Sequence, residues 1–429
     1  MIFTLSKNKI PLMPVSEKRG HELLTQKKAT IHKYFPFVIR LKKNYPIFDS
    51  KLTMKIRPGA NVSKIALAKG NDAICFFEIV HKSFIIKQKL VSRASLRRSR
   101  RNRNTRYREP GVPGWKRKDG WLPPSLHAKV IQTQNIVKKL CNHVPVGKIC
   151  LEYIKFDTQK MENPDISGVE YQQGELMGYE VREYLLEKWG RKCAYCGKEN
   201  VPFTIDHIIP KKRGGTDRIG NLTLACEDCN KKKGTKTAAE FGFPDLLTKA
   251  SKPLANIASL NSTRKAVVKA IKEVFDGEIE FVSAARTKKN RILFGVSKDF
   301  EASCVGKMEE TEKPTITTDY IEVWKAIGRG NRQICQPDAY GFPRAYRSRN
   351  KVKNGLQTGD FCKFKHTGKG KFAGKEGVGR VTVKADGTVY IQKGKEQLVS
   401  GTYKYFKLLQ HGDGWEYSKR KVVDNEAKE

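Results

Sequence analysis

The fold of the central part of the chain is decided by the sequence Cys193-Ala-Tyr-Cys196 … Thr204-Ile-Asp206-His207-Ile-Ile-Pro210 … Gly220-Asn221-Leu-Thr-Leu-Ala-Cys226-Glu-Asp-Cys229-Asn230. Two Cys-x-x-Cys pairs can close a tetrahedral Cys₄ zinc site. The 29 residues between the pairs exceed the ~15–20 of an ordinary zinc ribbon, and an inserted β-hairpin explains the excess. We therefore expect a small module over residues 181–242, held together by a structural zinc because its own core is small. The expected ligands are Cys193, Cys196, Cys226 and Cys229.

The polar residues of this module have the chemistry of a metal-dependent nuclease. Asp206 and His207 are adjacent on a predicted strand, so their side chains diverge. Asp206 and Asn230 offer the carboxylate and amide oxygens that Mg²⁺ accepts as ligands. His207 fits a general base that deprotonates the attacking water, while the metal stabilises charge on a phosphodiester. Asn221 leads the second strand and is better placed to brace the loop than to bind metal.

This pattern resembles the HNH, or ββα-metal, endonuclease family over residues 193–234. The resemblance implies that His207 is the base and that Asp206 and Asn230 are metal ligands. Some members have a His where Asn230 stands, and Asn at that position is a known variant of the motif. The resemblance therefore implies an intact catalytic set of His207, Asp206, Asn230 and Asn221.

The composition favours a nucleic-acid partner. The 429 residues include 84 Lys and Arg against 44 Asp and Glu, a formal charge of +40, which favours a polyanion and steeply salt-dependent binding. The longest apolar runs are shorter than the ~18–20 residues that span a bilayer, and the first residues lack the apolar core of a signal peptide. We expect a cytoplasmic, nucleoid-associated protein with no membrane partner. Ten cysteines, four of them paired in Cys-x-x-Cys, indicate one metal site and buried thiols in a reducing compartment.

Changes in pattern along the chain predict an α/β multidomain protein. Strand-like alternation covers residues 52–90, helical periodicity covers 125–143 and a strong strand covers 147–156. Short β-type runs with Gly turns follow from Gly359 and predict a small β-barrel. The expected parts are residues 1–50, 51–90, 91–110, 111–165, a polar linker at 166–180, 181–242, 243–315 and 316–429.

An arginine-rich segment runs from Arg93 to Arg108. It has no acid, Pro or Gly, and Pro110-Gly111 ends it, so a helix is expected. Its like charges repel one another at i,i+4, so it needs an anionic partner, for which nucleic-acid phosphates are the best fit. The expected RNA- or DNA-binding residues are Arg93, Arg97, Arg98, Arg100, Arg101, Arg103, Arg106 and Arg108.

The segments around the module resemble the IscB family, which comprises transposon-encoded, RNA-guided nucleases related to type II CRISPR effectors. Pro11-Leu-Met-Pro14 is similar to the motif that names the family's N-terminal domain, and the arginine-rich segment is similar to its bridge helix. Residues 147–157 resemble the second RuvC segment, and residues 286–291 and 302–306 resemble the third. Residues 333–335 and 340–344, with the β-rich tail, resemble the target-adjacent-motif domain.

The resemblance implies an RNase H-like (RuvC) mixed sheet that is split in sequence, with the HNH domain inserted between its second and third segments. It also implies a monomeric ribonucleoprotein in which a guide RNA reads a double-stranded DNA target by base pairing, while the protein reads only a short flanking motif. Arg344, Arg347 and Arg349 are candidates for reading that motif, although ordinary surface charge explains each of them as well.

The sequence departs from the family at the RuvC site, which normally gathers carboxylates around two metal ions. The resemblance implies an Asp where this chain has Arg57, and a His and an Asp where it has Lys298 and Glu301. Glu152 is retained. A cation where a metal should be held predicts a degenerate, catalytically inactive RuvC site.

We therefore expect an RNA-guided endonuclease that nicks only the guide-paired strand through its HNH domain. Two alternatives remain open: an RNA-guided DNA-binding protein that cuts nothing, and a protein-only, homing-type HNH endonuclease. Copurifying RNA would separate the last of these from the other two.

Overall fold

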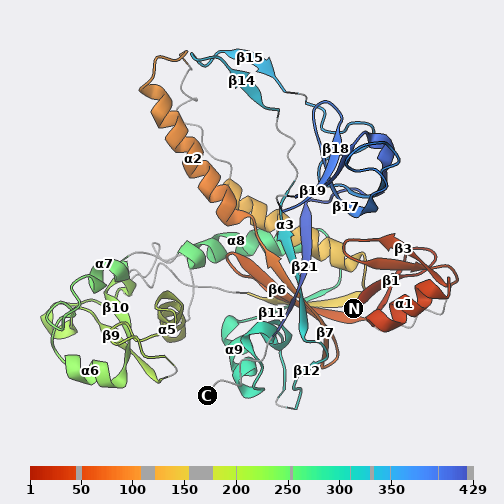
Figure 1. The fold of residues 1–429 in the computed structure, drawn as a ribbon. Helices are drawn as coiled ribbons and strands as arrows, with labels where there is room; N and C mark the ends of the chain where they lie inside the picture. Colours follow the sequence, from red (N-terminus) through yellow and green to blue (C-terminus); the bar gives the residue numbers. More distant parts are fainter. Residues whose placement is uncertain are drawn as a thin grey trace. The chain divides into compact units, whose positions relative to one another are not determined.

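The computed structural model describes residues 1–44, 51–107, 121–153, 177–199, 201–251, 255–309, 311–328, 333–347, 349–394 and 396–422. The chain forms two compact units (Figure 1). Unit 1 comprises Met1–Glu152 and Lys265–Glu429, and unit 2 comprises Tyr153–Arg264. The α/β expectation is confirmed, since both units combine helices with sheets.

A four-stranded sheet with one helix begins unit 1. Its strand order is β2 (Pro11–Val15), β1 (Ile2–Leu5), β4 (Val38–Leu41), β3 (Ala29–Lys33), and its helix is α1 (Glu17–Thr25). The hydroxyl of Ser16 caps α1 by accepting a hydrogen bond from Arg19 N at 3.2 Å. Ile2, Leu23 and Ile39 belong to the small core of this part.

An eight-stranded mixed sheet forms the centre of unit 1. Its order is β11 (Glu278–Val282), β8 (Val146–Glu152), β5 (Leu52–Arg57), β6 (Val62–Lys69), β7 (Asp72–Val80), β13 (Tyr320–Ala326) and β21 (Trp415–Lys421), with β12 (Thr315–Ile316) also beside β7. β5, β6 and β7 are the consecutive strands that the sequence predicted, and they form an antiparallel meander. β8 and β11 run parallel to β5. The sheet is thus drawn from segments far apart in the sequence.

Helices cover this sheet with apolar side chains. α3 (Pro124–Cys141) begins with a proline, which suits the first turn of a helix. It buries Ile136, Val137 and Leu140 completely in the main core, where α8 (Ala255–Lys272) contributes Val267 and Ile271. α9 (Ala284–Leu293) and the 3₁₀ segment η4 (Lys298–Cys304) follow β11. No helix in the described part of the chain is long and apolar enough to cross a membrane.

The arginine-rich helix lies earlier in the sequence than predicted. α2 spans Ser83–Arg101 and starts three residues after β7, so Arg103 and Arg106 lie beyond its C-terminal end, and Arg108 lies outside the described residues. The prediction placed its start near residue 91, because the arginines begin there. The preceding apolar residues, Phe84 and Ile85, continue the helix although they stay exposed.

The C-terminal part contains the hairpin β14 (Cys335–Pro337) and β15 (Pro343–Tyr346) and a five-stranded antiparallel sheet. The sheet order is β19 (Glu396–Gly401), β18 (Val389–Lys393), β17 (Glu376–Val383), β16 (Phe361–Lys365), β20 (Phe406–Gln410), with the short turn η5 (Tyr403–Tyr405) before β20. The predicted β runs are confirmed. The pairings described leave β19 and β20 at opposite edges and do not close the predicted barrel.

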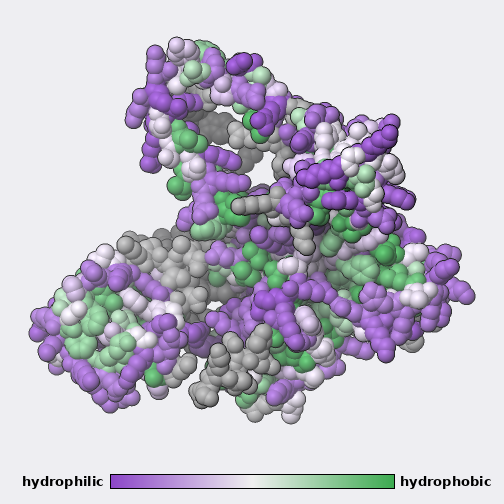
Figure 2. Space-filling model, viewed as in Figure 1, coloured by the Kyte–Doolittle hydropathy of each residue, from purple (hydrophilic) through white to green (hydrophobic). Residues whose placement is uncertain are grey.

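The predicted boundary at residue 316 divides a sheet. β13 and β21 both lie inside residues 316–429, yet they pair with each other and β13 pairs with β7 of the central sheet. The described residues between these two strands form the hairpin and the five-stranded sheet, which contacts the N-terminal part where Gln410 Nε2 donates to Phe35 O at 2.7 Å. Figure 2 shows many hydrophilic side chains on the face in view, with hydrophobic areas among them.

Unit 2 has a two-stranded antiparallel sheet, β9 (Phe203–His207) and β10 (Leu222–Cys226), followed by α6 (Glu227–Lys233). α5 (Met177–Lys188) and α7 (Leu246–Ser251) complete the unit, with the turns η2 (Lys211–Arg213) and η3 (Ile219–Asn221) between the strands. Leu185, Leu224 and Ala225 are fully buried in its core. Residues 177–180 of the predicted linker 166–180 are helical, and the rest of the linker lies outside the described residues.

Candidate active site

The strands β9 and β10 and the helix α6 place the polar residues of unit 2. His207 faces Leu222 in the strand register, and the loop that joins the strands is tied by Asn221. The Asn221 amide accepts a hydrogen bond from Ile209 N at 2.9 Å and donates to Ile209 O at 3.0 Å and to Thr216 O at 2.9 Å. The loop passes so close that a Cβ at Gly215 would lie 1.7 Å from Ile209 O.

Asp206 is buried and already paired within the unit. Tyr195 Oη donates to Asp206 Oδ2 at 2.5 Å. Lys233 Nζ donates to Oδ1 at 3.1 Å and lies 3.1 Å from Oδ2, and it also donates to His207 O at 2.7 Å. The Lys233 side chain is only 1% exposed. Burial, followed by the bond to Asp206, raises the pKa of Tyr195 well above its usual range, so the phenol stays protonated.

His207 points away from Asp206 and meets an exposed acid. Its Nε2 lies 2.7 Å from Asp217 Oδ1, while Lys211 Nζ lies 2.7 Å from Asp217 Oδ2. Lys211, and then His207, hold the pKa of Asp217 below its usual value. Asp217 therefore remains a carboxylate that can accept an Nε2–H hydrogen bond, which orients the ring and leaves Nδ1 as its basic nitrogen.

Asn230 lies beside the face of β9 that carries Asp206. Its Nδ2 donates to Thr204 Oγ1 at 3.0 Å, and Thr204 and Asp206 share one side of the strand because they are two residues apart. A carboxylate offers about four acceptor positions. Tyr195 takes a position on Oδ2 and Lys233 takes one on Oδ1, so each oxygen can still accept. The Asp206 carboxylate and the Asn230 amide oxygen are of the donor type that a hard divalent cation prefers.

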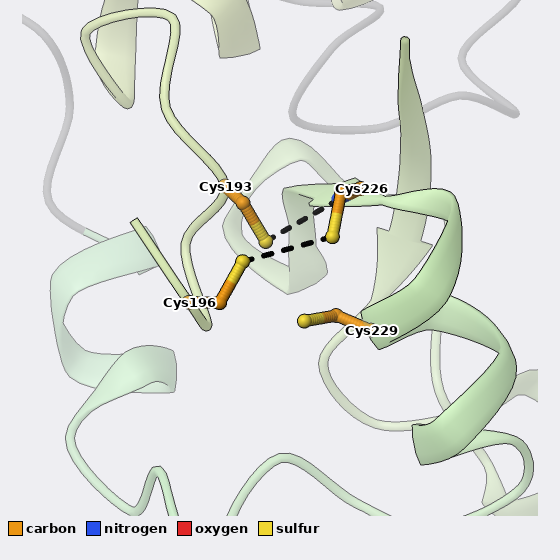
Figure 3. Close-up of side chains that lie close together, drawn as sticks. All are labelled: Cys193, Cys196, Cys226 and Cys229. Atoms are coloured by element: carbon orange, nitrogen blue, oxygen red, sulfur yellow. Dashed lines mark hydrogen bonds between the residues drawn. The ribbon is translucent and has the colours of Figure 1, made fainter. Parts of the chain in front are cut away.

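Four cysteines converge in unit 2. Figure 3 shows their sulfur atoms pointing toward one another, from the loop before β9, the end of β10 and helix α6. All four ligand atoms lie within 4.8 Å of one another. Cys226 N donates to Cys193 Sγ at 3.3 Å, and the Lys198 backbone N–H lowers the pKa of Cys196 to about 7. A soft, compact Cys₄ set of this kind can bind zinc.

A second acidic cluster lies in unit 1, where β5, β8 and η4 meet. Arg57 on β5 lies between two buried glutamates: its Nε is 3.5 Å from Glu152 Oε2, and its Nη1 is 3.0 Å from Glu301 Oε1. Lys64 Nζ adds a second cation 3.1 Å from Glu301 Oε1. Neither oxygen of Glu152 has a hydrogen bond from the described residues. Burial raises the pKa of Glu152, and Arg57 opposes that shift.

The basic residues of this cluster also hold η4 in place. Lys64 Nζ donates to the carbonyl of Lys298 at 2.7 Å, and buried Lys55 donates to Ser303 O at 2.7 Å. Lys298 thus contacts the cluster through its backbone, and the second cation is Lys64, which sequence analysis missed. A signal existed, because Lys64 is the strand-register partner of Arg57 in the β5–β6 hairpin.

Arginines of the predicted nucleic-acid surface line α2 and the residues after it. Every residue of α2 after Ser83 is partly or fully exposed, and the helix contains seven Lys or Arg and no acid. After the helix, Arg106 N donates to Tyr340 O at 2.8 Å and its guanidinium lies over the Phe342 ring, next to the β14–β15 hairpin. The candidates Arg344, Arg347 and Arg349 are exposed.

Two family models match the chain. One, described as RRXRR protein, matches residues 2–174, and the other, described as HNH endonuclease, matches residues 193–236. The chain therefore contains an HNH endonuclease domain, whose matched residues include Asp206, His207, Asn221 and Asn230. The two matches support a nuclease. No curated protein is similar enough in sequence to be matched.

Three solved structures with similarity to the chain are Cas9 enzymes. The type II-C Cas9 from Actinomyces naeslundii is 16% identical over 44% of this chain and 32% of its own, with a TM-score of 0.16. Streptococcus thermophilus Cas9 in complex with the AGAA PAM is 13% identical over 60% of this chain and 32% of its own, and the complex with the GGAA PAM is 13% identical over 59% and 32%; both TM-scores are 0.22. The chain spans about a third of the length of these proteins.

Proposed function

We propose that this protein is an RNA-guided DNA endonuclease of the IscB type that cuts only the guide-paired strand. The HNH domain makes the cut, and the RuvC-like site on the central sheet is inactive. The observation that carries the nicking proposal is the guanidinium of Arg57 between Glu152 and Glu301. It contrasts with unit 2, where the complete set of Asp206, His207 and Asn230 is present.

In the HNH domain, His207 is the general base. Asp217 accepts the Nε2–H hydrogen bond and holds the tautomer in which Nδ1 can take a proton from water. Asp206 and Asn230 hold a divalent cation such as Mg²⁺, which supplies charge stabilisation for the scissile phosphate when it is bound. Asn221 keeps the loop between the strands in place. Zinc on the four cysteines joins the two ends of the module.

In the RuvC-like site, two cations take the place of metal ions. Glu152 and Glu301 are 1% and 8% exposed in their side chains, and Arg57 and Lys64 neutralise them. A divalent cation would have to displace a guanidinium that is fixed by two carboxylates and would face Lys64 as well. This electrostatic arrangement supports the proposal that the RuvC-like site is inactive.

The exposed helix α2 is the proposed guide-RNA surface. A helix that buries almost none of its side chains and is rich in like charges gains little stability by itself. Phosphates of an RNA strand would pair with its arginines and remove that repulsion. The net charge of +40 supports the same class of partner.

The test uses protein purified with its own RNA. The RNA is sequenced, and a matched DNA duplex with a different label on each strand is incubated with Mg²⁺. We expect cleavage of the guide-paired strand only, abolished by His207→Ala and retained by His127→Ala, which removes an exposed histidine of α3. Cleavage of both strands would contradict an inactive RuvC-like site. Absence of RNA would favour the protein-only, homing-type enzyme.

Binding without cleavage is the second candidate, and one observation favours it. The ammonium of Lys233 already neutralises Asp206, so the proposed metal ligand is paired within the protein. Tight, RNA-dependent binding of the matched duplex, with both strands intact over a range of Mg²⁺ and Mn²⁺ concentrations, would support this candidate over the nickase.

A further inference from the structure

We propose that the two zinc knuckles position the catalytic carboxylate of the HNH domain, through Tyr195 on the first knuckle and Lys233 on the helix of the second. Both are positioning residues, because they act through Asp206. The inference rests on the proposed role of Asp206 as a metal ligand and adds a physical link between the zinc site and the catalytic metal site.

The first knuckle presents Tyr195 to Asp206. Tyr195 stands between Cys193 and Cys196, and this turn is fixed by Ala194 N donating to Leu224 O at 2.8 Å on β10. The ring packs edge-on against Phe241 and Phe243, with centroids 5.3 and 5.2 Å apart. The phenol is therefore fixed at both ends, by aromatic packing and by its 2.5 Å hydrogen bond to Asp206 Oδ2.

The second knuckle presents Lys233 to the same carboxylate. Cys226 is the N-cap of α6, and Cys229 lies within the helix. Lys233 follows Cys229 by four residues, so the two side chains lie on the same face, one turn apart. Its ammonium reaches Asp206 Oδ1 at 3.1 Å and His207 O at 2.7 Å.

The two contacts fix the orientation of the carboxylate. Tyr195 donates a hydrogen bond to Oδ2 and Lys233 donates one to Oδ1, while the Lys233 ammonium also lies 3.1 Å from Oδ2. Each oxygen keeps acceptor capacity, and the two contacts fix the direction in which Asp206 presents it to a cation. When zinc leaves, the turn that carries Tyr195 and the helix that carries Lys233 are no longer joined, and Asp206 loses both restraints.

The experiment compares cation binding in the full-length, zinc-loaded chain freed of RNA. Mn²⁺, as a probe for Mg²⁺, is titrated by electron paramagnetic resonance, and zinc content is measured on the same samples. Tyr195→Phe removes the hydroxyl but keeps the ring between Phe241 and Phe243. We expect it to retain one zinc per chain and to weaken Mn²⁺ binding about tenfold or more, as losses of groups that orient a metal ligand usually do.

Two further variants complete the design. Asp206→Asn should abolish Mn²⁺ binding at this site, and Lys231→Met removes an exposed lysine from α6 that pairs with Glu227 and should leave Mn²⁺ affinity unchanged. In the RNA-loaded protein, Tyr195→Phe should raise the Mg²⁺ concentration for half-maximal nicking by a similar factor. An excess of Mg²⁺ should restore most of the maximal rate, which a folding defect would not allow.

The outcomes separate the two levels of the proposal. If Asp206→Asn leaves Mn²⁺ binding intact, the metal-ligand assignment fails, and the positioning inference fails with it. If Asp206→Asn abolishes binding while Tyr195→Phe has wild-type Mn²⁺ affinity, the positioning inference alone is overturned. Loss of zinc from Tyr195→Phe would also overturn it, because the hydroxyl would then be serving the zinc site itself.

Discussion

Asp206 and His207 are neighbours in the sequence, but their side chains contact different groups. Asp206 turns inward to Tyr195 and Lys233, whereas His207 turns outward to Asp217. Strand alternation predicted this divergence, and the chemistry of the residue types singled out these two side chains as candidates. Their partners could not be predicted in this way, because Lys233 reaches Asp206 across 27 residues and its role depends on the fold of the whole module.

Asp217→Asn tests the orientation of the proposed base. The amide can still hydrogen-bond but no longer supplies a negative charge, and its NH₂ group can select the wrong ring tautomer. We expect the maximal nicking rate to fall about 10²- to 10⁴-fold, the range of general-base catalysis, with little change in DNA affinity. Single-turnover kinetics at saturating Mg²⁺ would measure this. A wild-type rate would remove Asp217 from the mechanism.

Arg57 makes a separate prediction for the central sheet. Arg57→Ala leaves Glu152 with no counter-charge among the described residues. Breaking a buried ion pair costs about 3–5 kcal/mol, and solvent screening of the partly exposed guanidinium reduces this to about 1–3 kcal/mol of unfolding free energy. Chemical denaturation would measure the loss.

Arg57→Asp should convert the same site into a cation binder. Three clustered carboxylates repel one another, and a bound divalent cation would relieve the repulsion and raise the melting temperature by linkage. Both proteins compared carry Asp206→Asn. Millimolar Mg²⁺ should raise the melting temperature of the protein that also carries Arg57→Asp, but not that of the protein that retains Arg57. An equal rise in both proteins would show that Arg57 does not exclude metal.

At the scale of elements, strands were easier to predict than the arginine-rich helix. β5, β6 and β7 have apolar, strand-like sequences bounded by turn residues and were placed to within two residues of their ends. Helix α2 has no buried stripe after its first residue, so hydrophobic periodicity could not locate its start. The pairing of β13 with β7 joins residues about 245 positions apart, as Glu322 and Phe77 are, and no local pattern marks such a contact.

The charge of α2 predicts a specific salt dependence. Replacing Arg97 and Arg98 with Gln should weaken guide-RNA binding and reduce the slope of log affinity against log salt by about 1.4, since each contact with a single strand contributes about 0.7. The same change at Lys18 and Lys28, exposed lysines of the N-terminal part, should alter the slope little. Filter-binding titrations from 50 to 400 mM salt would distinguish them, and equal slopes in both variants would place the RNA elsewhere.

At the scale of the whole molecule, the two units depend on different stabilising forces. Unit 1 is built on a continuous apolar core that includes fully buried Trp324, whereas unit 2 has a smaller core beside the four cysteines. Composition and motif spacing predicted the separate module, and its small size predicted the need for a metal.

Removal of zinc should therefore unfold unit 2 and spare unit 1. Structural zinc contributes about 10–16 kcal/mol in small zinc modules, which equals or exceeds the stability of a typical domain. Treatment with a strong chelator should expose residues 177–251 to protease and to hydrogen exchange while the central sheet stays protected. Cys335→Ser, which removes an exposed cysteine outside the cluster, should behave as wild type.

Unit 1 has its own sensitivity, to acid. Burial lowers the pKa of His81 to about 4, and burial likewise lowers the pKa of His143 to about 4. The unfolded chain binds these protons at about pH 6.5, so the unfolding free energy of unit 1 should fall as the pH drops from about 6.5 to about 4, by up to roughly 3 kcal/mol for each histidine. His81→Gln should lower the number of protons that the chain takes up on unfolding in this pH range by about one, whereas His127→Gln should not change it. Denaturation at a series of pH values would measure both slopes.

The junction of β13 and β21 offers a way to re-engineer the protein. Ala326 and Trp415 are direct partners in the antiparallel register, so the ends of the intervening segment emerge about 5 Å apart. Any foreign domain with closely spaced termini could be grafted there, and the two strands would still complete the sheet. Exchange of residues 327–414 between homologous proteins should therefore yield folded chimaeras, whereas a simple truncation at residue 326 would strip β21 from the sheet and leave β13 as a bare edge.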